Sequence, residues 1–399
     1  MTRRVSTLYG GRGVLALAVA LLIAMLSLAG AARADGDDDD DGGNTPGAVY
    51  AMTNESEGNR VLVYDRRADG TLAAPRSFAT GGTGSGLIDQ SGNSLILAGG
   101  SRESSPQNIG GSSKFLFTVN TGSNSVSSFR RNGNDLVLAD VQSGLNHPIS
   151  VTYNRNRLFV LNAVNQSCMG GIPTITGFTV SGDGELTPIP GSTRTVPGGT
   201  NSGCTQISFN PRGNVIVVTE KISDLIISYT VTRQGIPSEG MLNNTTGIDP
   251  FGFSFTRRGQ LATSENYNSV GGAVSTYNVP DNAVLQPISP SVLTTRNDSC
   301  WVVITNNQKY LYVSNAVSGD VTSYTLDSDG NIALLQAVAG DVGPMAFDEA
   351  LSRDSKYLYI RSITKGSIEA FAVQQDGSLV KIGSFFGLPP GSAEGLAAR

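Results

Sequence analysis

The most regular feature of the sequence is a six-residue, mostly apolar run that recurs seven times. Short apolar runs between turn-forming residues are typical of buried strands. Each run ends in a polar residue and is followed by a polar turn. The runs occupy 49–54, 115–120, 157–162, 215–220, 260–265, 310–315 and 357–362. The pattern therefore predicts seven equivalent strands.

Further strands accompany each run. An alternating strand follows, as in LIISYTV and VTSYTL, and six of the seven runs are preceded by another apolar segment, as at 204–211 and 300–307. Four of the alternating strands lead into an Asp-Gly pair, which favours a tight hairpin because both residues tolerate positive φ. These pairs lie at 69–70, 183–184, 329–330 and 376–377. Each repeat thus predicts four antiparallel strands.

The spacing of the runs indicates the architecture. Consecutive runs start between 42 and 66 residues apart, and four strands in about 40–50 residues are typical of a β-propeller blade. We therefore predict an all-β chain with a single seven-bladed propeller over residues 48–399. The first repeat lacks its innermost strand, and we expect the C-terminal segment 391–399 to supply it and close the ring. The widest spacing reflects a Gly/Ser-rich insertion at 99–113.

The N-terminal residues predict export. Positive residues precede the apolar segment 14–30, and small residues lead up to a cleavage site after Ala34, so residues 1–34 are typical of a secretory signal peptide. An uncleaved membrane anchor is the alternative. Residues 35–47 are acidic and Gly-rich, which favours a disordered linker. We expect a periplasmic or extracellular protein with no membrane span after cleavage.

Composition narrows the classes of partner. The net charge is −5 and only 15% of the residues are charged, so no basic surface for nucleic acid is expected. We expect a monomer that binds a small molecule. Three cysteines in an exported chain allow one disulfide. Cys168 follows the third run and Cys204 begins the next inner strand, which places both on one face of neighbouring blades. We therefore predict a Cys168–Cys204 disulfide, with Cys300 buried and free.

Polar residues should gather at one mouth of the central channel, where the runs end and the inner strands begin. The run ends are Asn54, Asn120, Asn162, Glu220, Glu265, Asn315 and Ser362, and the inner-strand starts include His147, Cys204 and Cys300, with Trp301 beside the last. Asparagine suits such corners because its side chain bonds nearby backbone groups. Glu220 and Glu265 depart from that pattern by adding charge.

The two glutamates allow several interpretations. Carboxylates that share a cavity raise the pKa of at least one of them and can perform acid–base chemistry. They could also hold Ca²⁺ or Mg²⁺ at the mouth, or pair with local cations. His147 is the only histidine, and an imidazole exchanges protons near neutrality. The catalytic candidates are Glu220, His147 and Glu265, and the substrate-binding candidates are Lys221, Asn162, Asn315, Asn120 and Trp301. No cofactor beyond that divalent cation is predicted.

The run YLYVSN at 310–315 and its copies resemble the lactonase-type seven-bladed propellers, which include 6-phosphogluconolactonases and carboxymuconate-lactonizing enzymes, and the related YVTN surface propellers. The resemblance covers residues 47–399. It implies a histidine at an inner-strand start and a glutamate at a strand end near the substrate, and His147 and Glu220 match these positions. It also implies arginines at other inner-strand starts. Cys204 and Cys300 stand there instead, which argues against an anionic substrate.

We therefore expect an exported lactonase-like propeller that hydrolyses or isomerises a small lactone at the channel mouth, with Glu220 and His147 as the acid–base pair. The alternative is a non-enzymatic surface or periplasmic propeller that binds a ligand or protein through the mouth or through the loop at 101–113. A third hypothesis is a non-catalytic scaffold stabilised by a cation at Glu220 and Glu265.

Overall fold

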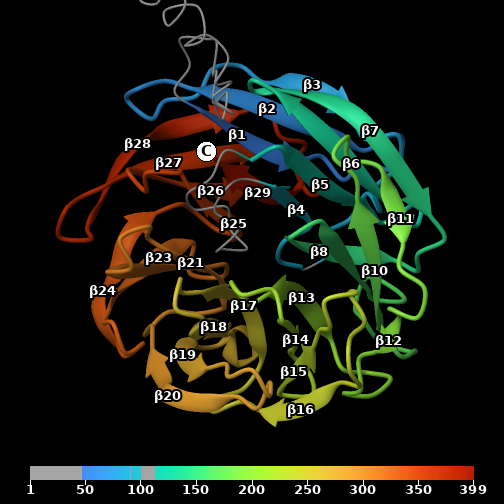
Figure 1. Cartoon of the computed structure of the whole chain (residues 1–399). Helices are drawn as coiled ribbons and strands as arrows, with labels where there is room; N and C mark the ends of the chain where they lie inside the picture. The colour runs from blue at the N-terminus through green and yellow to red at the C-terminus, as the bar shows by residue number, and fades with distance from the viewer. Residues whose placement is uncertain (1–46, 90, 100–112) are drawn as a thin grey trace, which may run out of the picture. The chain divides into compact units, whose positions relative to one another are not determined.

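The computed structural model describes residues 47–89, 91–99 and 113–399 (Figure 1). The predicted signal peptide, nearly all of the acidic linker and most of the insertion at 99–113 lie outside the described residues. Within these ranges the chain forms seven antiparallel sheets, each of which is one blade. No helix in the same ranges is long and apolar enough to cross a membrane.

Blades 1 to 4 contain the first half of the strands and the last strand of the chain. Blade 1 consists of β1 (Gly47–Met52), β2 (Arg60–Arg66), β3 (Arg76–Ala79) and β29 (Glu394–Ala398). Blade 2 consists of β4 (Leu95–Ala98), β5 (Phe115–Asn120), β6 (Ser125–Asn132) and β7 (Asp135–Ser143). Blade 3 consists of β8 (Pro148–Asn154), β9 (Arg157–Asn162), β10 (Thr174–Val180), β11 (Leu186–Pro188) and β12 (Arg194–Thr195). Blade 4 consists of β13 (Cys204–Phe209), β14 (Val215–Glu220), β15 (Leu225–Thr230) and β16 (Met241–Asn244).

Blades 5 to 7 repeat the same strand order. Blade 5 consists of β17 (Pro250–Phe255), β18 (Leu261–Glu265), β19 (Ala273–Asn278) and β20 (Gln286–Leu293), with the 3-10 turn η1 (Tyr267–Ser269) after β18. Blade 6 consists of β21 (Ser299–Ile304), β22 (Tyr310–Asn315), β23 (Asp320–Leu326) and β24 (Ile332–Asp341). Blade 7 consists of β25 (Ala346–Leu351), β26 (Tyr357–Ser362), β27 (Ser367–Val373) and β28 (Leu379–Phe386). The predicted runs form the second strand of every blade.

The C-terminal strand closes the ring. β29 pairs antiparallel with β1, so that Ala397 lies opposite Tyr50, and the Arg66 Nε donates a hydrogen bond to the carbonyl of Arg399. The innermost strands contact one another in the order β29, β4, β8, β13, β17, β21, β25 and back to β29. This closed cycle confirms the predicted seven-bladed fold and its closure by the C-terminus.

Aromatic side chains from one blade hold the Asp-Gly hairpins of the next. The Tyr359 hydroxyl donates to the carbonyl of Gly70 at 2.9 Å, and the Tyr312 hydroxyl donates to the carbonyl of Gly377 at 2.9 Å. Gly70 has a φ of +85°, and a Cβ there would lie 2.4 Å from the ring of Tyr357. Glycine is therefore required both by the turn and by the close approach of the neighbouring blade.

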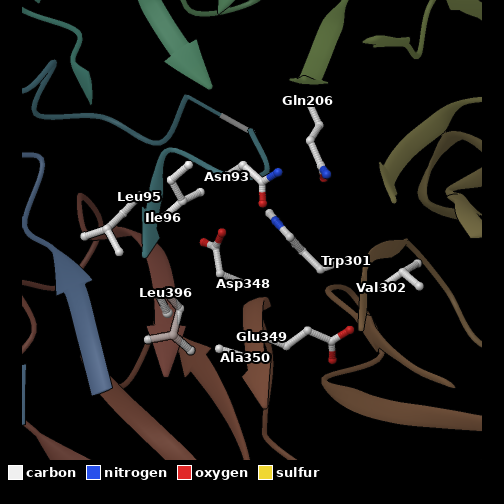
Figure 2. A pocket seen from close by; sticks show the side chains of 11 residues that line it. Asn93, Leu95, Ile96, Gln206, Trp301, Val302, Asp348, Glu349, Ala350 and Leu396 are labelled. Carbon is white, nitrogen blue, oxygen red and sulfur yellow. The ribbon is translucent and has the colours of Figure 1, made fainter. Parts of the chain in front are cut away.

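The described residues enclose a small cavity among the inner strands. It measures about 30 Å³ and is lined by Asn93, which precedes β4, and by residues that include Gln206, Trp301 and Asp348 (Figure 2). That space holds one or two water molecules. In Figure 2, Asp348 and Glu349 point in opposite directions. A sugar-sized ligand cannot occupy this cavity.

Candidate functional site

Five blades begin their innermost strand in the same way. The residue before each of β8, β13, β17, β21 and β25 has positive φ, and its carbonyl accepts a hydrogen bond from the residue that follows the second strand of the blade. These residues are His147, Gly203, Asp249, Asp298 and Met345. The positive φ of 53° at His147 is therefore a feature of the blade and not strain confined to one site. The structure adds Asp249 and Asp298 to the predicted mouth residues.

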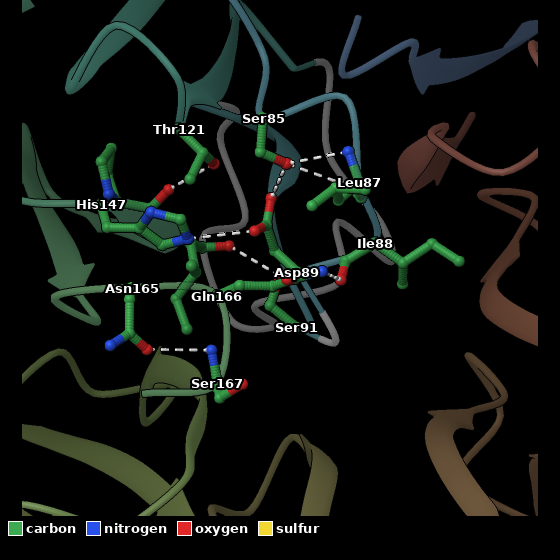
Figure 3. A network of polar contacts seen from close by, with 12 residues as sticks. Ser85, Leu87, Ile88, Asp89, Ser91, Thr121, His147, Asn165, Gln166 and Ser167 are labelled. Atoms are coloured by element: carbon green, nitrogen blue, oxygen red, sulfur yellow. Dashed lines mark hydrogen bonds and ion pairs between the residues drawn. The ribbon is translucent and has the colours of Figure 1, made fainter. Parts of the chain in front are cut away.

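The histidine at this position pairs with a buried aspartate. The His147 Nε2 lies 3.0 Å from the Asp89 Oδ1, and the Asp89 side chain is fully buried while the His147 side chain is 19% exposed (Figure 3). The other ring nitrogen, Nδ1, makes no hydrogen bond with a described residue. Asp89 thus fixes the orientation of the imidazole and leaves one nitrogen for a water molecule or a ligand.

Further donors hold the aspartate in place. The Asp89 Oδ2 accepts hydrogen bonds from the Ser85 hydroxyl at 2.7 Å and from the Asn54 Nδ2 at 3.1 Å. Figure 3 shows the carboxylate between the Ser85 hydroxyl and the His147 ring. Asn54, Ser85 and His147 thus hold this carboxylate in place. Asn54 is the one predicted run-end residue that reaches this network.

The segment that carries Asp89 crosses from blade 1 towards the other side of the mouth. Gln166 donates a hydrogen bond to the carbonyl of Ile88 at 2.7 Å, while the Ile88 side chain packs against a cluster from blades 5 to 7. That cluster includes Phe251, Trp301 and Phe347, whose rings meet edge to face. Polar groups of blades 1 to 3 and an aromatic wall therefore face the two sides of residues 85–89.

Glu394, the first residue of the closing strand β29, holds the backbone of Asp89. The backbone N–H of Asp89 donates to the Glu394 Oε1. Burial, and then the neighbouring charge of Asp89, raise the pKa of Glu394 well above its usual range. Arg361 is also buried, pairs with Asp348 at 2.6 Å and donates to the carbonyl of Ala393. Closure of the ring by β29 thus completes the support of the Asp89–His147 pair.

Glu220 does not face His147. Its side chain is buried and accepts a hydrogen bond from the Ser223 hydroxyl at 3.3 Å. Burial raises the pKa of Glu220, and its polar neighbours, including the Ser223 hydroxyl, partly oppose that shift. The carboxylate therefore joins the loop before β13 to blade 4, and the expected contact with the histidine is not formed.

The reason for a glutamate at this strand end lies in the third strand. Asn120 donates to the hydroxyls of Ser125 and Ser127 on β6. The positions that correspond to these serines in blade 4 are Leu225 and Ile227, which offer no side-chain acceptor. A longer carboxylate reaches the loop instead.

Glu265 has the same kind of environment. The hydroxyls of Ser275 and Ser291 donate to its carboxylate, the latter at 2.7 Å, and burial raises its pKa. Two of the predicted substrate-binding asparagines are likewise engaged within their blades: Asn162 donates to Thr174 and Thr176, and Asn315 donates to Asp320 and Thr322. The functional roles predicted for these residues and for Glu220 stay predictions.

Lys221 lies near the two aspartates at the mouth. Its Nζ is 5.4 Å from the centre of the Phe251 ring. Burial lowers the pKa of Lys221, and the charges of Asp249 and Asp298 oppose that effect. Burial also raises the pKa of both aspartates. Lys221, a predicted substrate-binding residue, is therefore half-buried near carboxylates and an aromatic ring.

The predicted disulfide is confirmed. Cys168 and Cys204 are bonded, with their Cα atoms 5.5 Å apart, and both are buried. Cys300 is free and buried, as predicted. Burial raises the pKa of its thiol well above the usual range, which argues against a nucleophilic thiolate. Among the described residues, no group of three or more His, Cys, Asp or Glu side chains is arranged to hold a metal ion.

Part of the chain matches a known protein family. Residues 262–391, from β18 to the segment after β28, match the family described as lactonase, seven-bladed β-propeller. The blades in this range therefore resemble those of the lactonase propeller family. No curated protein matches the chain. The match confirms the resemblance seen in the sequence, and it covers the last three blades of this lactonase-type propeller.

Solved structures share the fold of the whole propeller. The periplasmic gluconolactonase of Pseudomonas aeruginosa is 16% identical, with a TM-score of 0.67 over 88% of this chain and 98% of its own. A Lactobacillus plantarum protein is 15% identical, with a TM-score of 0.66 over 88% and 99%. A Bacteroides fragilis protein, provisionally assigned as a 6-phosphogluconolactonase, is 17% identical, with a TM-score of 0.63 over 88% and 98%. At these identities the likeness shows the fold alone.

The lactonase-type propeller has the histidine that the resemblance implied. However, two arginines near the mouth form ion pairs with aspartates of the protein. Arg296 pairs with Asp320, and Arg361 pairs with Asp348. Asp89 was missed by sequence reasoning because it lies in an irregular segment between two blades. Asp249 and Asp298 could have been found by aligning IDP and NDS with the tripeptide NHP that contains His147.

Proposed function

We propose that this lactonase-type propeller is an exported enzyme that hydrolyses small uncharged lactones at the channel mouth. One observation carries the proposal: a buried carboxylate, Asp89, holds the ring of the only histidine and leaves its Nδ1 without a hydrogen-bond partner among the described residues. A carboxylate that orients an imidazole is a recurrent arrangement for general base catalysis.

The proposed reaction uses this pair to activate water. With the Nε2 proton held by Asp89, the His147 Nδ1 accepts a proton from a water molecule while the water oxygen attacks the lactone carbonyl carbon. The bond between that carbon and the ring oxygen then breaks. The ring oxygen takes the proton from the imidazolium, and the product is a hydroxy acid. Asp89 stabilises the transient imidazolium by its negative charge.

The charges near the mouth favour an uncharged substrate. Arg296 and Arg361 are committed to Asp320 and Asp348, so a bidentate clamp for a phosphate or carboxylate is missing among the described residues of this face. Lys221, whose pKa is lowered by burial, is the proposed group that polarises the carbonyl. The aromatic wall of Phe251 and Trp301 suits the apolar face of a lactone ring.

Three observations support export. The N-terminal segment has the pattern of a signal peptide, the Cys168–Cys204 disulfide suits an oxidising compartment, and the structural relative from Pseudomonas aeruginosa is described as periplasmic.

A second candidate function is ligand binding without catalysis. The filled channel and the anchoring of residues 85–89 across the mouth favour it, because they limit access to the axis. In that case the mouth would recognise a partner through the same polar and aromatic groups.

Turnover of lactones distinguishes these functions. The mature protein would be assayed with D-glucono-1,5-lactone and with its 6-phosphate, and the uncatalysed rate would be subtracted. We expect saturable hydrolysis of the neutral lactone and a much lower kcat/KM for the phosphate ester. Glu220→Gln serves as a comparison and should retain the activity. Saturable binding without turnover would support the binding propeller, and preference for the phosphate ester would refute the proposed substrate class.

A further inference from the structure

A second cavity lies at the opposite ends of the inner strands from the mouth. It is formed by the turn between β13 and β14, the turn between β17 and β18, and the hairpin between β19 and β20. Its volume is about 530 Å³, compared with about 30 Å³ for the channel cavity. Sites for small molecules typically measure about 300–1,000 Å³. This cavity between blades 4 and 5 is therefore large enough for a metabolite.

Three arginines line this cavity, and no acidic side chain is among the described residues that line it. Arg212 comes from the turn of blade 4, and Arg257 and Arg258 come from the turn of blade 5. Only Arg212 is paired with an acid, since its Nη1 lies 3.0 Å from the Asp281 Oδ1. The Arg258 Nη1 donates to the neutral carbonyl of Ser328 at 2.7 Å. Neither Arg257 nor Arg258 forms an ion pair with a described residue, so two positive charges at the cavity are uncompensated.

The local charge opposes that of the whole chain, whose net charge is −5. The Asp281 carboxylate is already engaged by Arg212 and by the Asn214 Nδ2 at 2.9 Å. These hydrogen bonds, from Asn214 and then Arg212, hold the pKa of Asp281 below its usual value. Asp281 is therefore not free to neutralise the two other arginines.

The turn that carries the arginine pair is held rigidly. The Thr256 backbone N–H donates to the carbonyl of Gln260 at 2.8 Å, and the Gly259 N–H donates to the carbonyl of Thr256 at 3.0 Å. The Thr256 hydroxyl donates to the Gln260 Oε1 at 2.6 Å. Because the backbone is fixed at both ends, the two arginine Cα atoms are pre-positioned, which lowers the ordering entropy that a ligand has to offset.

We propose that this cavity binds a small anion that carries at least two negative charges on carboxylate or phosphate groups. Guanidinium groups bind both kinds of group in a bidentate manner. Two uncompensated charges match a dianion, and the amide side chains of Asn278 and Gln286 on the same walls can bond its hydroxyls or remaining oxygens. The site is distinct from the proposed lactone site, so it acts as a separate ligand site on the other face.

Citrate and inorganic phosphate are the probes. Each would be titrated into the mature protein by calorimetry, in a buffer without other polyvalent anions and at constant ionic strength. Arg257→Gln/Arg258→Gln is the test variant. Arg353→Gln is the matched control, because Arg353 is exposed in the corresponding turn of blade 7 but does not line the cavity. Thermal unfolding of each variant without ligand checks that the fold is retained.

We expect saturable binding of citrate, of phosphate or of both by the wild-type chain and by the control. The double variant should bind at least about tenfold more weakly, since each hydrogen bond to a charged group contributes enough for roughly that factor. Tighter binding of citrate would assign the site to polycarboxylates, and tighter binding of phosphate would assign it to phosphate groups. Absence of saturable binding, or equal weakening in the control, would overturn the proposal.

Discussion

Removal of the disulfide is predicted to destabilise the propeller strongly. The bond joins the loop after β9 in blade 3 to the first residue of β13 in blade 4, and it closes a segment of 36 residues. In the chain-entropy treatment, a loop of this length lowers the entropy of the unfolded chain by an amount equivalent to about 4 kcal/mol at 25 °C. Cys168→Ser with Cys204→Ser should therefore lower the free energy of unfolding by about 4 kcal/mol.

The assay can use a single intrinsic probe. Trp301 is the only tryptophan and is buried at the channel cavity, so its fluorescence reports the loss of the ring structure during urea titration. Cys300→Ser is the control, because that thiol is free. We expect the control to unfold close to the wild-type midpoint and the double variant at a clearly lower one. A difference of less than about 1 kcal/mol between oxidised wild type and the double variant would refute the role given to the disulfide.

Two further predictions concern buried charges. Burial raises the pKa of Glu220 above its ordinary value of 4.5, so the folded protein binds this proton more tightly than the unfolded chain, and stability is lost as the pH rises through the raised pKa. Glu220→Gln should remove this decline, as measured by urea unfolding from about pH 4.5 upward, and an unchanged pH profile would contradict the assignment. Arg361→Met should cost about 3–5 kcal/mol because it leaves Asp348 buried without its cation. The double variant with Asp348→Asn should recover part of that loss, and equal stability of the two variants would argue against the ion pair.

The fold was predictable because its determinants are local and repeated. Each blade restates the same apolar run, so seven copies specify the architecture even where one is irregular. Closure by β29 was predictable because the first repeat lacks an innermost strand. The disulfide followed from the same register, which places Cys168 and Cys204 on one face.

The partners of the polar side chains were less predictable, because they depend on neighbouring strands and loops. A strand end alone does not show that Leu225 and Ile227 deprive Glu220 of the partners that Asn120 has in blade 2. The partner of His147 is Asp89, which lies 58 residues away in a segment without periodicity. Only the assembled ring brings these two side chains together.

The most direct test of the account is the effect of Asp89 and His147 on lactone hydrolysis. The kcat/KM of Asp89→Asn and of His147→Ala would be compared with that of the wild-type chain, using D-glucono-1,5-lactone. A positioned general base contributes about 10²–10⁴-fold, so we predict losses of that size in both variants, with retained thermal unfolding transitions. Activity within about threefold of wild type in both folded variants would contradict the proposed site.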